Sequence, residues 1–317
     1  MRFLSGPRRA RGPPRTRRIE DRGRLGYPRL VRGGGLRRLW GRGARGTLAA
    51  RSIGPASPAS AAHVAPVDGF FYHTIDLPGH DTILGAWDLR GDPDAYLGFV
   101  DFAGKRVLEV GAANGYLSFE MERRGASVVA YDLSPDLLGD IMEVPGLDLA
   151  SFHERYRTTV RGLNRAWRYA HDALGSAAVL VHGSAYEIPD EVGPVDVVTF
   201  GSILLHLRDP FSVLGQAALR ARERIVVTDT LNPPFTLESQ ERGMIFDPSL
   251  GRDPCSWWSL SPQAVRRMLE IHGFGRSSVY FHRQIFRPDF APWGHTRPGE
   301  HTGPEITGTL FTVVAER

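Results

Sequence analysis

The chain has 317 residues, of which 42% are hydrophobic and 23% charged, with a formal net charge of +4 and a single cysteine, Cys255. One cysteine excludes an intrachain disulfide and a metal cluster built from several thiolates. No run approaches the ~18 apolar residues of a membrane span, and no apolar segment follows the N-terminal charges as in a secretion signal, so we expect a cytoplasmic protein that lacks a membrane segment.

The charge is unevenly distributed along the chain. Residues 1–52 contain 16 arginines, no lysine and two acidic residues, so they carry +14 and leave −10 for residues 53–317. This segment is rich in Gly, Pro and Arg without apolar periodicity, which predicts a disordered tail over residues 1–60. It is interpreted as a nucleic-acid or membrane-surface arm, a targeting peptide, or an extension without a selected role; Lys105 is the only lysine in the chain, which favours the last.

Residues 61–317 are predicted to form one domain, which begins with aromatic and ionisable side chains over residues 61–100. The segments 70–76 and 87–90 contain His73, Trp87 and Arg90. These residues either cover a bound ligand as a lid that excludes water, or brace the sheet that follows.

The most informative stretch is residues 106–117, Arg-Val-Leu-Glu-Val-Gly-Ala-Ala-Asn-Gly-Tyr-Leu. It predicts a strand over 106–110, a glycine-rich turn, and a helix over 116–124 whose N-terminus binds a ligand. Ala113 stands where a pyrophosphate-binding motif has its second glycine, which favours a ligand without a diphosphate. Asp132 ends the next predicted strand, 127–132, at the spacing expected for an acid that accepts hydrogen bonds from ribose hydroxyls.

This pattern resembles the first motif of the class I S-adenosylmethionine-dependent methyltransferases. The resemblance implies S-adenosyl-L-methionine as cofactor, with Glu109 at its amino-acid end, Gly111 and Gly115 allowing the close turn, and Asp132 at the ribose. The cofactor-binding residues predicted in and beside these two segments are Glu109, Gly111, Ala112, Asn114, Gly115, Asp132 and Leu133.

Further strands are predicted over residues 178–182, 195–200, 224–228, 278–282 and 310–315, with helices after Asp209 and between Ser261 and Gly273. Alternating strands and helices predict an α/β fold with a doubly wound, mostly parallel seven-stranded sheet, and the resemblance implies an antiparallel hairpin from the last two strands. The segments 133–176, with a helix over 159–174, and 231–260, with Trp257 and Trp258, are expected to wall the substrate site at the carboxyl edge of the strands.

Two segments after strands complete the predicted site. In the resembled family an acidic residue after the third strand reaches the adenine; here Ser184 and Ala185 match, and a serine lacks the charge. After the fourth strand, Gly201 and Ser202 are expected to line the methionine part, in a segment that resembles small-molecule and wobble-uridine methyltransferases. His206 is the catalytic candidate, as a general base, with a structural role as the alternative.

We therefore expect methyl transfer to O, N or C of a small, aromatic or amphipathic acceptor. A first alternative is an RNA-modifying methyltransferase, which the charge of −10 on residues 53–317 disfavours. A second is a cofactor-binding module without turnover. His295 and His301 lack the spacing of a metal site, so no metal is predicted, and no oligomeric state is specified.

Overall fold

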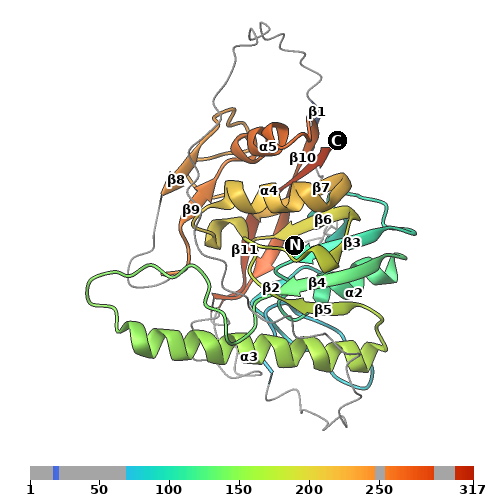
Figure 1. Cartoon of the computed structure of the whole chain (residues 1–317), viewed down its shortest axis with the longest axis vertical. Coiled ribbons are helices and arrows are strands. Elements are labelled where there is room, and N and C mark those ends of the chain that lie inside the picture. Colours follow the sequence, from blue (N-terminus) through green and yellow to red (C-terminus); the bar gives the residue numbers. More distant parts are fainter. Residues whose placement is uncertain (1–16, 21–68, 247–253, 289–303) are drawn as a thin grey trace, which may run out of the picture. The chain divides into compact units, whose positions relative to one another are not determined.

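A computed structural model describes residues 17–20, 69–246, 254–288 and 304–317, which contain one large sheet with helices on both faces (Figure 1). Its parallel strands are β3 (Arg106–Val110), β4 (Ser127–Asp132), β5 (Val179–His182), β6 (Val195–Gly201) and β7 (Ala221–Thr230). They lie in the order β5-β4-β3-β6-β7, so the direction of winding reverses between β3 and β6. Ligands of open α/β sheets bind outside the carboxyl ends of the strands at such a reversal.

Two long antiparallel strands extend this sheet. β11 (Ile306–Glu316) pairs with β7, and β10 (Arg276–Phe286) pairs with β11 along its whole length. All seven predicted strands are therefore present, and the predicted antiparallel pairing of the last two strands is confirmed.

Within the described residues the sheet has nine strands, two more than predicted, because two short segments pair with β10. They are β2 (Trp87–Asp88) and β1 (Arg17–Glu20). β1 is the part of the predicted tail, residues 1–60, that the structure describes; the rest of that prediction, like His295 and His301, lies outside the described residues. A separate ribbon pairs β8 (Met244–Phe246) with β9 (Trp258–Leu260), which were also not predicted.

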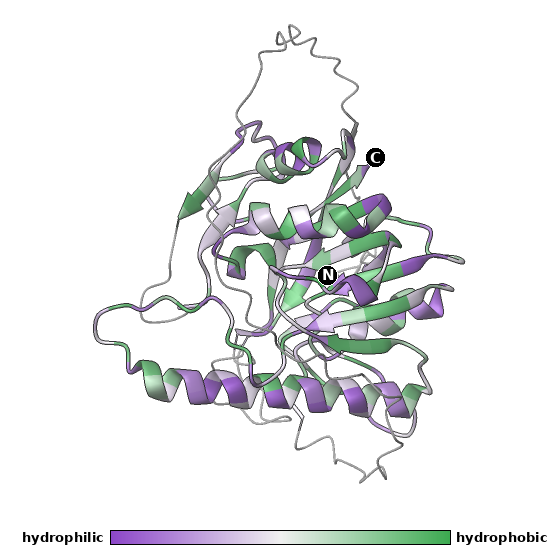
Figure 2. Ribbon diagram, in the orientation of Figure 1, coloured by the Kyte–Doolittle hydropathy of each residue, from purple (hydrophilic) through white to green (hydrophobic). Residues whose placement is uncertain are grey.

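The helices pack on both faces of the sheet through apolar side chains. One core lies between β3, β4 and β11 and three helices, α1 (Pro93–Tyr96), α2 (Tyr116–Arg123) and α3 (Leu149–Leu174). The other lies between β6 and β7 and α4 (Pro210–Arg220), α5 (Pro262–Ile271) and the short 3-10 helix η3 (Leu204–His206). Figure 2 shows the central strands as hydrophobic and α3 with alternating hydrophobic and hydrophilic stripes. No helix among the described residues has the length and hydropathy needed to cross a membrane.

The predicted helix starts are confirmed where a capping residue precedes proline. Asp209 accepts the N–H of Ser212 at the start of α4, and Ser261 accepts the N–H of Ala264 at the start of α5, each followed by proline at the first helical position. α3 begins ten residues before the predicted start at 159, because Asp148 caps it by accepting the N–H of Ser151.

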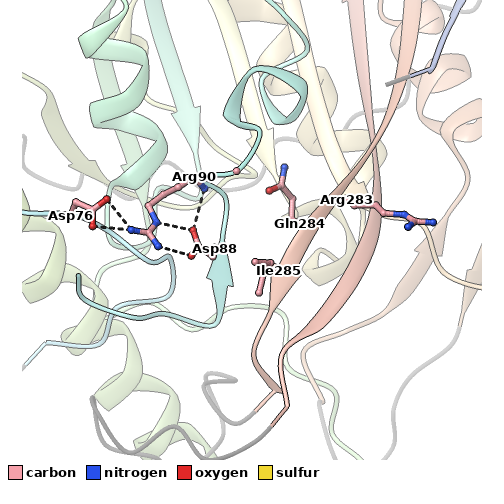
Figure 3. A pocket seen from close by; sticks show the side chains of 7 residues that line it. Asp76, Asp88, Arg90, Arg283, Gln284 and Ile285 are labelled. Atoms are coloured by element: carbon pink, nitrogen blue, oxygen red, sulfur yellow. Dashed lines mark hydrogen bonds and ion pairs between the residues drawn. The ribbon is translucent and has the colours of Figure 1, made fainter. Parts of the chain in front are cut away.

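The segment before the sheet is fixed by charged side chains. Arg90 donates to Asp76 and Asp88, and Figure 3 shows its guanidinium lying between the two carboxylates, beside a pocket of about 410 Å³ between β2 and β10. Arg287, 4% exposed, donates to Thr74 and pairs with Glu305. This geometry favours the brace over the lid.

Candidate active site

The five parallel strands end at one edge of the sheet, and the predicted cofactor residues come directly after them. The glycine-rich turn follows β3, Asp132 and Leu133 end and follow β4, Ser184 and Ala185 follow β5 after one glycine, and Gly201 and Ser202 end and follow β6. Because parallel strands share their carboxyl edge, the fold brings these segments together although they span 94 residues of sequence.

The turn after β3 depends on backbone conformations that favour glycine. Gly111 and Gly115 have φ of 84° and 87°, and Gly115 precedes the first residue of α2. A Cβ on Gly115 would lie 2.5 Å from the Phe119 ring and 2.7 Å from Trp167, so this position also permits a close approach. Ala113 adopts φ of 50° without being glycine. The predicted glycine roles therefore have a structural basis in the backbone.

Asp132 organises the neighbouring backbone. Its two carboxylate oxygens accept N–H groups from Ala113 and from Leu133, each at 2.7 Å. Burial raises the pKa of this carboxyl, and the two backbone N–H groups oppose that shift. The side chain is only partly buried. Each oxygen has one further lone pair, so Asp132 can accept two more hydrogen bonds from a ligand at the turn.

Glu109 lies deeper, on β3. It is 2% exposed and accepts a hydrogen bond from the hydroxyl of Ser118 on α2. Burial, with a smaller contribution from the Asp132 carboxylate, raises the pKa of Glu109 to about 8. Within the free protein this carboxyl therefore holds a proton at neutral pH, and a cationic ligand group would favour its ionised form.

Asn114 connects the turn to the preceding brace. Its side-chain Oδ1 accepts the N–H of His73 at 2.7 Å, and its Nδ2 donates to the carbonyl oxygen of the same residue at 3.0 Å. Asn114 is 0% exposed. Its side chain therefore supports the turn from behind.

The segment after β5 is held by hydrogen bonds to its own backbone groups. The N–H of Gly183 donates to the carbonyl of Asp132 at 3.0 Å, and the Tyr131 hydroxyl donates to the carbonyl of Ser184 at 3.0 Å. The Ser184 hydroxyl accepts the N–H of Tyr186, so it is used within its own turn. Ala185 packs against the core of the α4 face.

The segment after β6 meets the glycine-rich turn. A Cβ on Gly111 would lie 3.1 Å from Ile203, so the two segments are in close contact. The N–H of Ser202 donates to the carbonyl of Thr228 at 2.7 Å, and its hydroxyl lies 3.5 Å from that of the buried Tyr96 on α1. Gly201 and Ser202 therefore lie at the winding reversal, beside the turn.

His206, at the end of η3, has a defined tautomer. Its Nδ1 lies 3.0 Å from the carbonyl oxygen of Cys255, and because a carbonyl only accepts, Nδ1 carries the proton. In the neutral ring, Nε2 is then unprotonated and available as a proton acceptor. The same hydrogen bond also holds residues 254–258 against η3. This arrangement is therefore compatible with His206 as a general base and with a structural role.

Four loops form one wall beyond η3. The carboxylate of Asp140 accepts the Tyr186 hydroxyl and the N–H of Arg208, and its carbonyl accepts the indole N–H of Trp257 at 2.9 Å. Trp258 donates to the carbonyl of Leu207 at 2.9 Å. The two segments expected to wall the site are therefore hydrogen-bonded to the loops that follow β5 and β6.

Sequence reasoning missed Asp229, near the end of β7. It is 2% exposed, its Oδ1 accepts the N–H of Thr230 at 2.8 Å, and burial raises its pKa to about 7. Part of the signal was available, because Asp229 follows an apolar run as Asp132 does, but it lacks the spacing of about 20 residues from the glycine-rich turn that identified Asp132.

An open parallel sheet with a glycine-rich turn at its winding reversal, and an acid at the end of the adjacent strand, defines an α/β protein that binds a nucleoside-type cofactor. The sequence model of the family described as "Methyltransferase domain" matches residues 91–275. The chain belongs to this family, which confirms the resemblance identified from the first motif.

Individual proteins are also similar to the chain. The ubiquinone biosynthesis O-methyltransferase of Hahella chejuensis is 32% identical over 130 residues, 40% of this chain and 44% of that protein. The protein of the same name from Psychrobacter cryohalolentis is 31% identical over 131 residues, 41% of this chain and 42% of its own length. The chain thus covers less than half the length of these curated relatives. A solved structure, the magnesium protoporphyrin IX methyltransferase of Synechocystis PCC 6803 with bound S-adenosylhomocysteine, is 15% identical with a TM-score of 0.39, covering 72% of this chain and 78% of that chain.

Proposed function

We propose that the protein transfers the methyl group of S-adenosylmethionine to a small-molecule acceptor. The observation that carries the proposal is the junction of the glycine-rich turn with Asp132, whose carboxylate orders the turn and keeps capacity for two hydroxyl donors. When bound, the cofactor supplies a methyl group activated by a sulfonium sulfur.

The residues present fit this cofactor. The close turn at Gly111 and Gly115 admits a ligand without a diphosphate, and Asp132 matches two ribose hydroxyls. Glu109, buried and without a cationic partner in the described residues, suits the ammonium of the amino-acid end. Ser184 and Ala185 offer the adenine a hydroxyl, backbone groups and apolar packing in place of a carboxylate. The proposed cofactor site also includes Ala112, Asn114, Leu133, Gly201 and Ser202.

The acceptor is expected at the wall beyond η3, where aromatic side chains gather. Phe246 of β8 lies 6.1 Å from Trp257 and 5.6 Å from Trp258 between ring centroids, and Arg208 lies 5.2 Å over the Trp257 ring. This composition favours an aromatic or amphipathic acceptor. We propose that Nε2 of His206 takes the proton that such an acceptor loses as its methyl bond forms.

Calorimetric titration of the full chain with S-adenosylhomocysteine tests the cofactor. Wild type should bind, and Asp132→Ala should weaken binding by at least about a hundredfold, because it removes two charge-assisted hydrogen bonds worth about 1.5–3 kcal/mol each. Asp136→Ala removes an exposed carboxylate from the same loop and should bind as wild type does.

Either of two results would contradict the proposal: a folded wild type that binds neither S-adenosylhomocysteine nor S-adenosylmethionine, or equal affinities of wild type and Asp132→Ala for the ligand that binds. Circular dichroism of each variant separates lost binding from lost folding. Methyl transfer is then assayed with labelled cofactor against a panel of phenols and amines.

A further inference from the structure

One carboxyl oxygen of Asp229 accepts no hydrogen bond from the part of the chain that the structure describes. Oδ1 accepts the N–H of Thr230, whereas Oδ2 is buried and has no partner among the described residues. Buried carboxyl groups are usually paired or fully hydrogen-bonded, because removing them from water is costly. A ligand group that is positive or donates a hydrogen bond would stabilise a buried oxygen of this kind.

Asp229 lies beside the segment that follows β6, which belongs to the proposed cofactor site. The preceding residue, Thr228, accepts the N–H of Ser202, and the backbone N–H of Leu205 in η3 faces the Asp229 carboxyl. Burial raises the pKa of Tyr96, and the Asp229 and Glu109 carboxyls add to this shift; the Tyr96 hydroxyl lies 3.5 Å from Ser202 Oγ. Two buried carboxyl groups therefore flank the ends of β3, β6 and β7.

This pair of carboxyl groups has no cation beside it in the described part of the chain. Backbone N–H groups and the Thr230 side chain are the groups that offset the burial of Asp229, and the Ser118 hydroxyl does so for Glu109. A positively charged ligand would supply the missing partner. Its attraction to these carboxylates is stronger where water is excluded, because the dielectric constant is lower there.

We propose that Asp229 makes the site prefer S-adenosylmethionine, which carries a positive sulfonium, over S-adenosylhomocysteine, whose sulfur is neutral. This inference rests on the proposed function. The two ligands share their ribose, adenine, ammonium and carboxylate, and they differ by one methyl group and one positive charge. In this proposal the Asp229 carboxylate faces the sulfur and stabilises only the charged ligand, whereas Glu109 at the shared ammonium stabilises both ligands alike. The reaction product therefore binds more weakly than the methyl donor.

Calorimetric titration of the full chain with each ligand separately, without any acceptor, tests the proposal. Asp229→Asn keeps the shape of the side chain and should weaken S-adenosylmethionine binding by about tenfold, with a change below about twofold for S-adenosylhomocysteine. Glu109→Gln should weaken both ligands by the same factor. Asp190→Asn removes one negative charge at the exposed start of a 3-10 helix before β6 and should change neither.

Equal effects of Asp229→Asn on both ligands, or no effect on either, overturn the inference while the proposed function stands. If folded wild type binds neither ligand, the proposed function is overturned and this inference with it. If Asp229→Asn does not fold, wild type decides: S-adenosylmethionine must bind more tightly than S-adenosylhomocysteine, and equal or weaker binding overturns the inference.

Discussion

Replacing Asn114 by alanine should strongly destabilise the protein, because one side chain satisfies both backbone groups of a residue 41 positions earlier. The N–H and the carbonyl of His73 lose partners at 2.7 and 3.0 Å, and His73 is 5% exposed, so water does not replace them. A buried polar group that loses its partner costs about 1–3 kcal/mol. Two such groups predict a loss of about 2–6 kcal/mol in the free energy of unfolding.

Urea unfolding followed by circular dichroism and tryptophan fluorescence measures this loss. The midpoint should fall without a change in the slope of free energy against urea, since the loss is local. Asn232→Ala is the matched control: its amide makes one hydrogen bond, to Thr230 Oγ1 at 3.1 Å in a partly buried position, so about 1 kcal/mol or less is expected. A loss for Asn114→Ala below about 0.5 kcal/mol, the range of ordinary surface substitutions, would refute the reasoning.

Three further predictions concern the same edge of the sheet. Glu109 has a pKa of about 8 in the folded protein against an ordinary value of 4.5, so between these values the folded state retains a proton that the unfolded state has lost. Stability should therefore fall as pH rises from 6.5 to 8, by up to about 1.4 kcal/mol per pH unit from this group, and Glu109→Gln should flatten the fall in urea unfolding. Gly115→Ala should cost about 2–4 kcal/mol in thermal or urea unfolding, from positive φ and overpacking. His206→Asn, which keeps a donor for the Cys255 carbonyl but has no base, should bind S-adenosylhomocysteine normally and slow methyl transfer by roughly 10²- to 10⁴-fold.

Each of these has a distinguishing control. Gly146 also has a φ of 86°, but nothing lies within 4 Å of a Cβ added there, so Gly146→Ala should lower the free energy of unfolding by only about 1–2 kcal/mol. An equal loss at Gly115 and Gly146 would exclude overpacking as a cause. A pH dependence unchanged by Glu109→Gln would assign it to other groups, such as Asp229. Wild-type rates in His206→Asn together with loss in His206→Ala would assign the histidine a positioning role.

The central strands and the cofactor turn could be predicted because their signals are local. Apolar β-branched runs identified β3, β4 and β6, and proline after a capping residue identified α4 and α5. The turn was readable because positive φ at Gly111 and Gly115 is a backbone requirement that the residue type reports directly.

The short strands and the wall could not be predicted in the same way. β2 has two residues and β1 four, and each exists by pairing with β10 rather than by its own composition. The side chain of Asp140 accepts from residues 46 and 68 positions away, contacts that only the finished fold brings together. No pattern along the chain distinguishes Asp140 from the other acids of its loop.

The difference between Asp132 and Asp229 shows where sequence reasoning stops short of chemistry. Asp132 ends an apolar strand and Asp229 lies next to the end of one, but Asp132 has a protein donor for each oxygen, whereas one oxygen of Asp229 is buried and has no partner among the described residues. The first arrangement is complete without a charged ligand and suits neutral hydroxyls; the second remains costly until a cation or donor arrives. The same residue type in the same pattern therefore predicts two different ligand groups, and the distinction depends on which backbone N–H groups the neighbouring loops present.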